Sequence, residues 1–127
     1  MPGYLADTCV IIDLINNRGN RREFIWNLLQ PGDTLGYCTI NLIEVYTGMR
    51  PGEERVTDMF FERLLYYEVV QDIAKQAGSL RFHWRQRGQT LSLADATIAA
   101  VALRHGLTLL TGNGKHFPMA DLALLPV

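Results

Sequence analysis

The stretch LSLADATIAAVALRHGLTLLT, residues 91–111, decides the fold class. Its first part is the clearest helix in the chain, because Ser92 supplies an N-cap hydroxyl and Gly106 supplies a C-terminal stop. LTLLT, residues 107–111, is typical of a fully buried strand. The helix must run antiparallel to the strand that follows it, and the pair therefore predicts one unit of a parallel, helix-covered sheet.

The same alternation continues outward along the chain. Strands are predicted at residues 3–6, 34–38, 66–70, 107–111 and 122–127. Helices are predicted at residues 8–17, 21–30, 40–50, 53–65, 71–88 and 91–106, with Thr39 capping the third, Phe24, Ile25, Leu28 and Leu29 on one face of the second, and a loop or helical turn at 112–117. This alternation predicts one α/β domain over residues 1–127, with a parallel sheet in a three-layer α/β/α arrangement.

Composition narrows the class of protein further. Hydrophobic residues make up 48% of the chain, which is enough for one packed core. No apolar stretch approaches the roughly 18–20 residues of a membrane helix, and no signal-peptide pattern precedes Val10, so we expect a cytoplasmic protein without membrane contact. Cys9 and Cys38 fit no metal or redox spacing and are expected to be buried thiols. With a net charge of −1, any polyanion must be bound through a local patch or a metal ion.

Three carboxylates and one amide are expected at one edge of the sheet. Sites in such sheets form beyond the carboxyl ends of the strands. Asp7 follows the first predicted strand, and Asn113 follows the strand at 107–111. Asp95 lies in the first turn of its helix, and Glu44 lies roughly 7 Å along its own helix at ~1.5 Å per residue. All four are therefore predicted to converge.

A divalent cation would explain the three acids. None of them has a basic residue within helical reach, so local ion pairs do not account for them. Mg²⁺ takes oxygen ligands and is commonly held by a few carboxylates and waters. Each acid also has a structural alternative: Asp95 forms a capping box with Ser92, Glu44 lies on a solvated helix face, and Asp7 caps the helix that follows it.

Four segments resemble, in order and spacing, the motifs of PIN-domain ribonucleases, most of all the VapC toxins. They are LADTCVIIDL, TINLIEVYTG, LSLADATIAAVALRHG and LLTGNGKHF. The resemblance implies a five-stranded parallel sheet and an endoribonuclease that depends on Mg²⁺ or Mn²⁺. It also implies an RNA substrate, a cognate antitoxin and a homodimer. It carries over Asp7, Glu44 and Asp95 as acids of the metal site and Thr111 as a recurrent polar position. Asn113 stands where many relatives have Asp, and it is a further candidate ligand.

Several other polar residues are candidates for support of the site or for RNA contact. The set is Thr8, Thr111, Lys115, His116 and Arg85. Arg85 belongs to the segment RFHWRQRG, whose arginines and Trp84 either contact RNA or form a solvated helix face. Asp13 is expected on the solvent side of its helix, and His105 is expected as a helix C-terminal residue favoured by the dipole.

Two other functions compete with the nuclease. One is a receiver-like phosphoacceptor module, but that site needs adjacent acids after the first strand, and Asp7 is followed by Thr8. The third strand offers only Asp72 as an acceptor. The other is a PIN fold that binds nucleic acid without turnover. Metal-dependent RNA cleavage distinguishes the nuclease from both.

Overall fold

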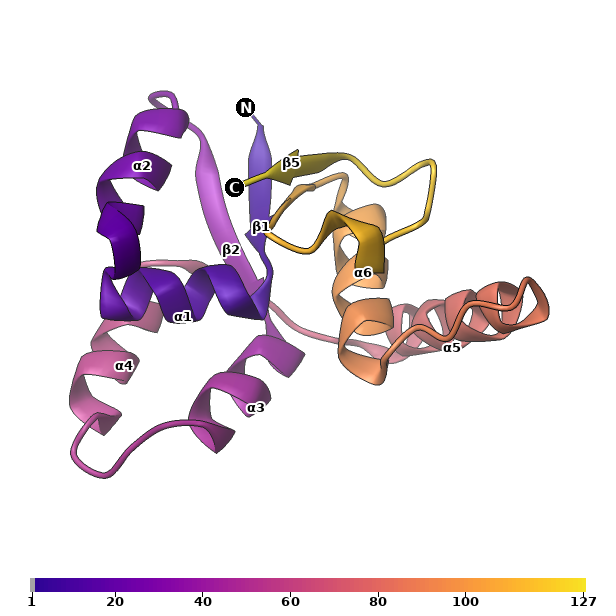
Figure 1. Ribbon diagram of the computed structural model, residues 1–127, viewed down its shortest axis with the longest axis horizontal. Helices are drawn as coiled ribbons and strands as arrows, with labels where there is room; N and C mark the ends of the chain where they lie inside the picture. The colour runs from indigo at the N-terminus through magenta and orange to yellow at the C-terminus, as the bar shows by residue number, and fades with distance from the viewer. Residues whose placement is uncertain (1) are drawn as a thin grey trace.

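A five-stranded, fully parallel sheet forms the centre of the computed structural model, which describes residues 2–127 (Figure 1). The strands are β1 (Gly3–Ala6), β2 (Thr34–Cys38), β3 (Leu65–Tyr67), β4 (Thr108–Thr111) and β5 (Leu124–Pro126), in the spatial order β3-β2-β1-β4-β5. The α-helices are α1 (Thr8–Asn16), α2 (Arg21–Leu28), α3 (Thr39–Thr47), α4 (Glu54–Glu62), α5 (Gln71–Gln86) and α6 (Leu93–His105), with 3-10 turns η1 (Arg18–Asn20) and η2 (Gly114–His116).

Helices cover both faces of the sheet, and each face has its own apolar core. Consecutive strand residues point to opposite faces, so Leu5 and Ala6 of β1 enter different cores. Leu5 packs with residues of α5 and α6, whereas Ala6 packs with residues of α1 to α4. Figure 1 shows these two groups of helices on either side of the sheet. The predicted three-layer α/β/α arrangement with five parallel strands is therefore confirmed.

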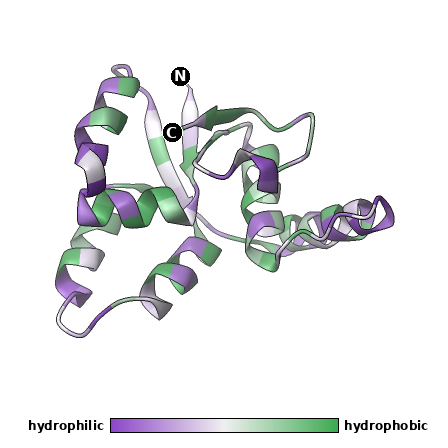
Figure 2. Ribbon diagram, in the orientation of Figure 1, coloured by the Kyte–Doolittle hydropathy of each residue, from purple (hydrophilic) through white to green (hydrophobic). Residues whose placement is uncertain are grey.

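Helix α6 is the most deeply buried helix element of the fold. Residues 96–102 are all buried, and the helix is hydrophobic over most of its length in Figure 2. Both predicted ends are confirmed: the Ser92 hydroxyl accepts a hydrogen bond from the Asp95 N–H at 3.0 Å, and Gly106 adopts the left-handed conformation with φ +63°. The buried body and fixed start of α6 hold its first turn at one place beside the sheet.

Strand β1 lies at the centre of the sheet and brings the carboxyl ends of three strands together. It pairs in parallel with β2 on one side and with β4 on the other. The Asp7 N–H extends the second pairing by donating to the Leu110 carbonyl at 2.9 Å. The residues that follow β1, β2 and β4 therefore leave the sheet at the same edge, as the sequence predicts.

The third strand and the start of α3 differ from the sequence prediction. Strand β3 spans Leu65–Tyr67 rather than 66–70, because its partner β2 ends at Cys38, which pairs with Tyr67. Beyond that point the Val69 N–H donates to the Thr39 hydroxyl at 3.0 Å. Thr39 is therefore the first residue of α3 and not its cap. Cys38 holds the cap position, and its N–H donates to Asn41 Oδ1 at 2.7 Å.

Strand β5 and helix α2 also differ from the sequence prediction. The last strand is shorter than predicted, since Leu122 still belongs to a turn in which its N–H donates to the Met119 carbonyl. Helix α2 turns Ile25 into the core and leaves Phe24 46% exposed. Within residues 2–127, no helix combines the length and the apolar character needed to span a bilayer.

Candidate active site

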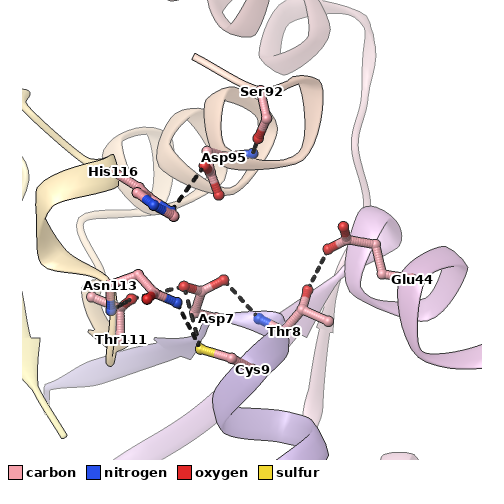
Figure 3. A network of polar contacts seen from close by, with 9 residues as sticks. All are labelled: Asp7, Thr8, Cys9, Glu44, Ser92, Asp95, Thr111, Asn113 and His116. Atoms are coloured by element: carbon pink, nitrogen blue, oxygen red, sulfur yellow. Dashed lines mark hydrogen bonds and ion pairs between the residues drawn. The ribbon is translucent and has the colours of Figure 1, made fainter. Parts of the chain in front are cut away.

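Asp7 is a buried carboxylate at the centre of the sheet edge (Figure 3). It is the N-cap of α1 and is 6% exposed. Its Oδ1 accepts from the Thr8 N–H at 2.8 Å, and its Oδ2 accepts from the Thr111 hydroxyl at 2.7 Å. Both donors are neutral groups, and among residues 2–127 no basic side chain lies at hydrogen-bond distance from the Asp7 carboxylate. The capping alternative is correct for Asp7, and it leaves a site role open.

Asp95 extends from the first turn of α6 toward the same edge. Its backbone N–H binds the Ser92 hydroxyl, and its carboxylate lies 3.6 Å from His116 Nδ1, which is an ion-pair distance. Burial raises the pKa of Asp95, and the negative charges of Asp7 and Glu44 raise it further, whereas the Ser92 hydrogen bond and His116 lower it. Asp95 therefore lies within electrostatic reach of the other two acids.

Glu44 is an exposed residue of α3 whose carboxylate is held by a single side-chain contact. Its Oε1 accepts a hydrogen bond of 2.6 Å from the Thr8 hydroxyl. Thr8 is the residue whose N–H binds Asp7, and Glu44 is thereby tied to the same corner of the sheet. The structure places Asp7, Glu44 and Asp95 along the same edge of the sheet (Figure 3).

Thr111 and Asn113 complete this edge from β4 and the loop after it. The Thr111 hydroxyl donates to Asp7 and accepts from the Asn113 N–H at 2.9 Å. The Asn113 side-chain amide lies 3.5 Å from Cys9 Sγ, which lies 3.7 Å from Asp7 Oδ2. The Asn113 side chain is therefore turned toward the acids and not away from them.

Two residues of the site were missed in the sequence. Cys9 was predicted to be a buried thiol but is only half-buried, and it contacts Asp7 and Asn113; Cys38 is buried as predicted. Burial raises the Cys9 pKa. Asn41 is fully buried beneath Thr8 and donates to its hydroxyl at 2.9 Å. The signal for Asn41 is a polar residue between the apolar Ile40 and Leu42, three residues after the end of β2.

The other predicted support residues divide into two groups. His116 lies at the site, and Lys115 precedes it on η2 with an exposed side chain. Arg85 belongs to the last turn of α5, and Figure 1 shows that end of α5 projecting away from the sheet, so Arg85 is not brought to the acids. Asp13 pairs with Arg18 and Arg21 at 3.9 and 3.7 Å and lies outside the site, as expected.

The donor chemistry of this edge fits a hard divalent cation. Asp7, Glu44 and Asp95 offer carboxylate oxygens, and Asn113 offers a neutral amide oxygen. In the part of the chain that the structure describes, residues 2–127, no three His, Cys, Asp or Glu side chains are close enough to form a ready metal-binding group.

A separate apolar groove lies between α1, α2 and α4. It encloses about 220 Å³ and is lined by Leu14, Ile15, Arg22, Trp26, Val56, Met59, Phe60, Arg63 and Leu64. Trp26 and Met59 are 54% and 47% exposed, which is unusual for such large apolar side chains at the surface of one chain. Arg22 and Arg63 give the groove a basic rim.

Comparison with known proteins identifies relatives over nearly the whole chain. The family model described as "PIN domain" matches residues 4–122. Ribonuclease VapC19 of Mycobacterium tuberculosis is 28% identical over 115 residues, which cover 91% of this chain and 92% of the relative.

The strand order found here also differs from the 2-1-3-4-5 order of receiver-like folds, so the receiver alternative was wrong.

Two solved structures share the fold of this chain over nearly its whole length. The fold matches VapBC2 from Rickettsia felis, solved bound to a promoter DNA fragment, with a TM-score of 0.85, 25% identity and 98% of each chain covered. It also matches a toxin–antitoxin complex from Klebsiella pneumoniae, with a TM-score of 0.78, 29% identity and 98% of each chain covered.

Proposed function

The chain belongs to the PIN-domain family, and on that basis we propose that it is a metal-dependent endoribonuclease, the toxin of a toxin–antitoxin pair acting in the cytoplasm. The observation that carries the proposal is the convergence of Asp7, Glu44 and Asp95 at the carboxyl edge of the sheet. Three like charges held near one another are costly, and a divalent cation would offset that cost.

The residues at this edge of the sheet have different proposed roles. Asp7, Glu44 and Asp95 would hold Mg²⁺ or Mn²⁺, with Asn113 as a further oxygen donor. Thr111 keeps Asp7 in place through its hydroxyl. His116 and Lys115 lie at the rim, where the Lys115 ammonium and a His116 N–H would meet an RNA phosphate. When bound, the cation supplies the Lewis acidity that activates water and neutralises the phosphate charge.

Carboxylates alone could not catalyse the cleavage of an RNA phosphodiester bond, because their negative charge repels the phosphate. The bound cation reverses the sign of the site. Attack of water on phosphorus, with the 3′ oxygen leaving, produces 5′-phosphate and 3′-hydroxyl ends.

The decisive experiment incubates the purified protein with a structured RNA in Mg²⁺ or Mn²⁺ and determines the chemistry of the new ends. We expect 5′-phosphate ends, complete inhibition by EDTA, and loss of cleavage in Asp7→Asn and Asp95→Asn with circular dichroism unchanged. Asp121→Asn, an exposed acid outside the site, is the matched control. Cyclic 2′,3′-phosphate ends that persist in EDTA would point to the histidines instead, and RNA binding without cleavage would support the inactive scaffold.

The groove between α1, α2 and α4 supports an antitoxin helix as the partner. An amphipathic helix places its apolar face in such a groove, and the Arg22 and Arg63 rim favours acidic residues beside that face. Trp26, Met59 and Phe60 line the groove, whereas Phe24 and Leu28 are not among its lining residues. A homodimer is implied by the resemblance to the family and stays a prediction.

A further inference from the structure

Thr8 contacts two of the three acids at once. Its backbone N–H donates to Asp7 Oδ1 at 2.8 Å, and its hydroxyl donates to Glu44 Oε1 at 2.6 Å. Asp7 is buried and fixed by several hydrogen bonds, whereas Glu44 is exposed and has a long, flexible side chain. The position of Glu44 relative to Asp7 therefore depends on which way the Thr8 hydroxyl points.

A fully buried amide decides that direction. The Cys38 N–H can only donate, so Asn41 must present its oxygen to it, and this bond is 2.7 Å long. The Asn41 NH₂ group then faces Thr8 and donates to the hydroxyl at 2.9 Å. Because the Thr8 oxygen accepts on that side, its own hydrogen is directed outward to the Glu44 carboxylate, which can only accept.

We propose that Asn41 and Thr8 form a positioning relay that fixes Glu44 against Asp7 for metal binding. The relay starts at the Cys38 N–H, passes through the Asn41 amide and the Thr8 hydroxyl, and ends at Glu44 Oε1. It leaves Glu44 Oε2 for the cation, and it rests on the metal-site assignment of the proposed function. Asn41 touches neither substrate nor cation and acts only through Thr8.

The relay has a specific consequence for metal affinity. Hydrogen-bond partners behind a metal ligand typically contribute about 10-fold or more to affinity, because they hold the ligand in its binding orientation. We therefore expect Thr8→Val, which keeps the shape of the side chain and removes the hydroxyl, to weaken Mn²⁺ binding about 10-fold. Thr8→Ser keeps the hydroxyl and should restore binding close to the wild-type value.

The test measures Mn²⁺ binding by calorimetry, with no RNA present, on folded protein verified by thermal unfolding. Thr47→Val is the matched control, because the Thr47 hydroxyl lies on the same helix as Glu44 but binds the Ile43 carbonyl. Asn41→Asp gives a second, independent variant. It keeps an oxygen for the Cys38 N–H but replaces the donor with an acceptor, so the Thr8 hydrogen turns inward and Mn²⁺ affinity should fall as in Thr8→Val.

A double-variant comparison separates the relay from the metal-site assignment. Glu44→Gln should weaken Mn²⁺ binding, and Thr8→Val added to it should have little further effect, because Thr8 acts through Glu44. Independent effects of the two changes, or tighter Mn²⁺ binding in Thr8→Val, would overturn the relay and leave the metal site standing. Unchanged affinity in Glu44→Gln would overturn the assignment of Glu44 and the relay with it.

Discussion

The Thr111 hydroxyl donates to Asp7 Oδ2 at 2.7 Å and joins two residues that lie 104 positions apart in the chain. The same oxygen accepts the Asn113 N–H. Thr111→Val should therefore leave a buried carboxylate and a backbone N–H short of one partner each. We expect a loss of about 1–3 kcal/mol in the free energy of unfolding, measured by urea denaturation. Thr111→Ser, which keeps the hydroxyl, should lose clearly less; equal losses would mean that the methyl packing matters more than the hydrogen bond.

Stability without metal should depend on pH through Asp95. Its pKa is raised in the folded protein, chiefly by burial, so folding disfavours the ionised form. A carboxyl of this kind makes the protein less stable as the pH rises through its folded pKa, and that loss persists at neutral pH. Asp95→Asn should therefore be more stable than wild type at pH 7 in EDTA. The N-cap contact is kept, because it uses the Asp95 backbone N–H.

The pH dependence supplies the check on this explanation. The advantage of Asp95→Asn should shrink below about pH 4, where the wild-type carboxyl is protonated as well. Asp121→Asn makes the same chemical change at an exposed position and should show no such trend. An advantage of Asp95→Asn that stays constant down to acid pH would show that charge is not its cause.

Asn113 sets the requirement for a second ion. Asp7, Glu44 and Asp95 carry three negative charges against two on one Mg²⁺, so one ion should bind to the protein alone and a second only together with RNA. Asn113→Asp adds a fourth carboxylate beside Cys9 and Asp7. It should lower the Mg²⁺ or Mn²⁺ concentration needed for half-maximal cleavage. A metal titration of both proteins decides it, and an unchanged midpoint would assign Asn113 to the loop, where Asn often stabilises turns.

The groove between α1, α2 and α4 should lose its partner when its exposed apolar residues become charged. Trp26→Asp and Met59→Asp place a carboxylate where an antitoxin helix would be buried, and each should weaken the complex roughly 30-fold. RNA cleavage by the free protein should be unchanged, because the groove is separate from the acids. Phe82→Asp, at an apolar residue of α5 that is 64% exposed, is the control. Equal binding by all three variants would exclude the groove as the docking site.

The sequence predicted the features that depend on backbone pattern. Alternating apolar runs predicted the parallel sheet, and the ends of its strands placed Asp7 and Asn113 at one edge. Ser92 and Gly106 predicted both ends of α6 because capping is local: the partner lies within a few residues. In each case the physical cause is contained in a short window of the chain.

Contacts between distant side chains could not be predicted in this way. Thr39 has the sequence of a helix cap, but its hydroxyl binds Tyr66 and the Val69 N–H, which only tertiary structure brings near. No local sequence pattern indicates that Asn41 forms a hydrogen bond with Thr8. Helix α2 is too short for a clear periodicity, and the sequence therefore does not show that Ile25 is buried while Phe24 is exposed.

The central position of β1 also determines when the site comes into existence. A ribosome makes Thr111 104 residues after Asp7, and β1 needs β4 as a neighbour. Until that segment emerges and docks, Asp7 lacks the donor that holds its Oδ2, and the loop with Asn113 and His116 does not exist. A nascent chain in which β4 has not yet emerged therefore carries Asp7, Glu44 and Asp95 without the hydrogen bond that joins Asp7 to Thr111. The complete arrangement forms only after β4 has emerged and has paired with β1.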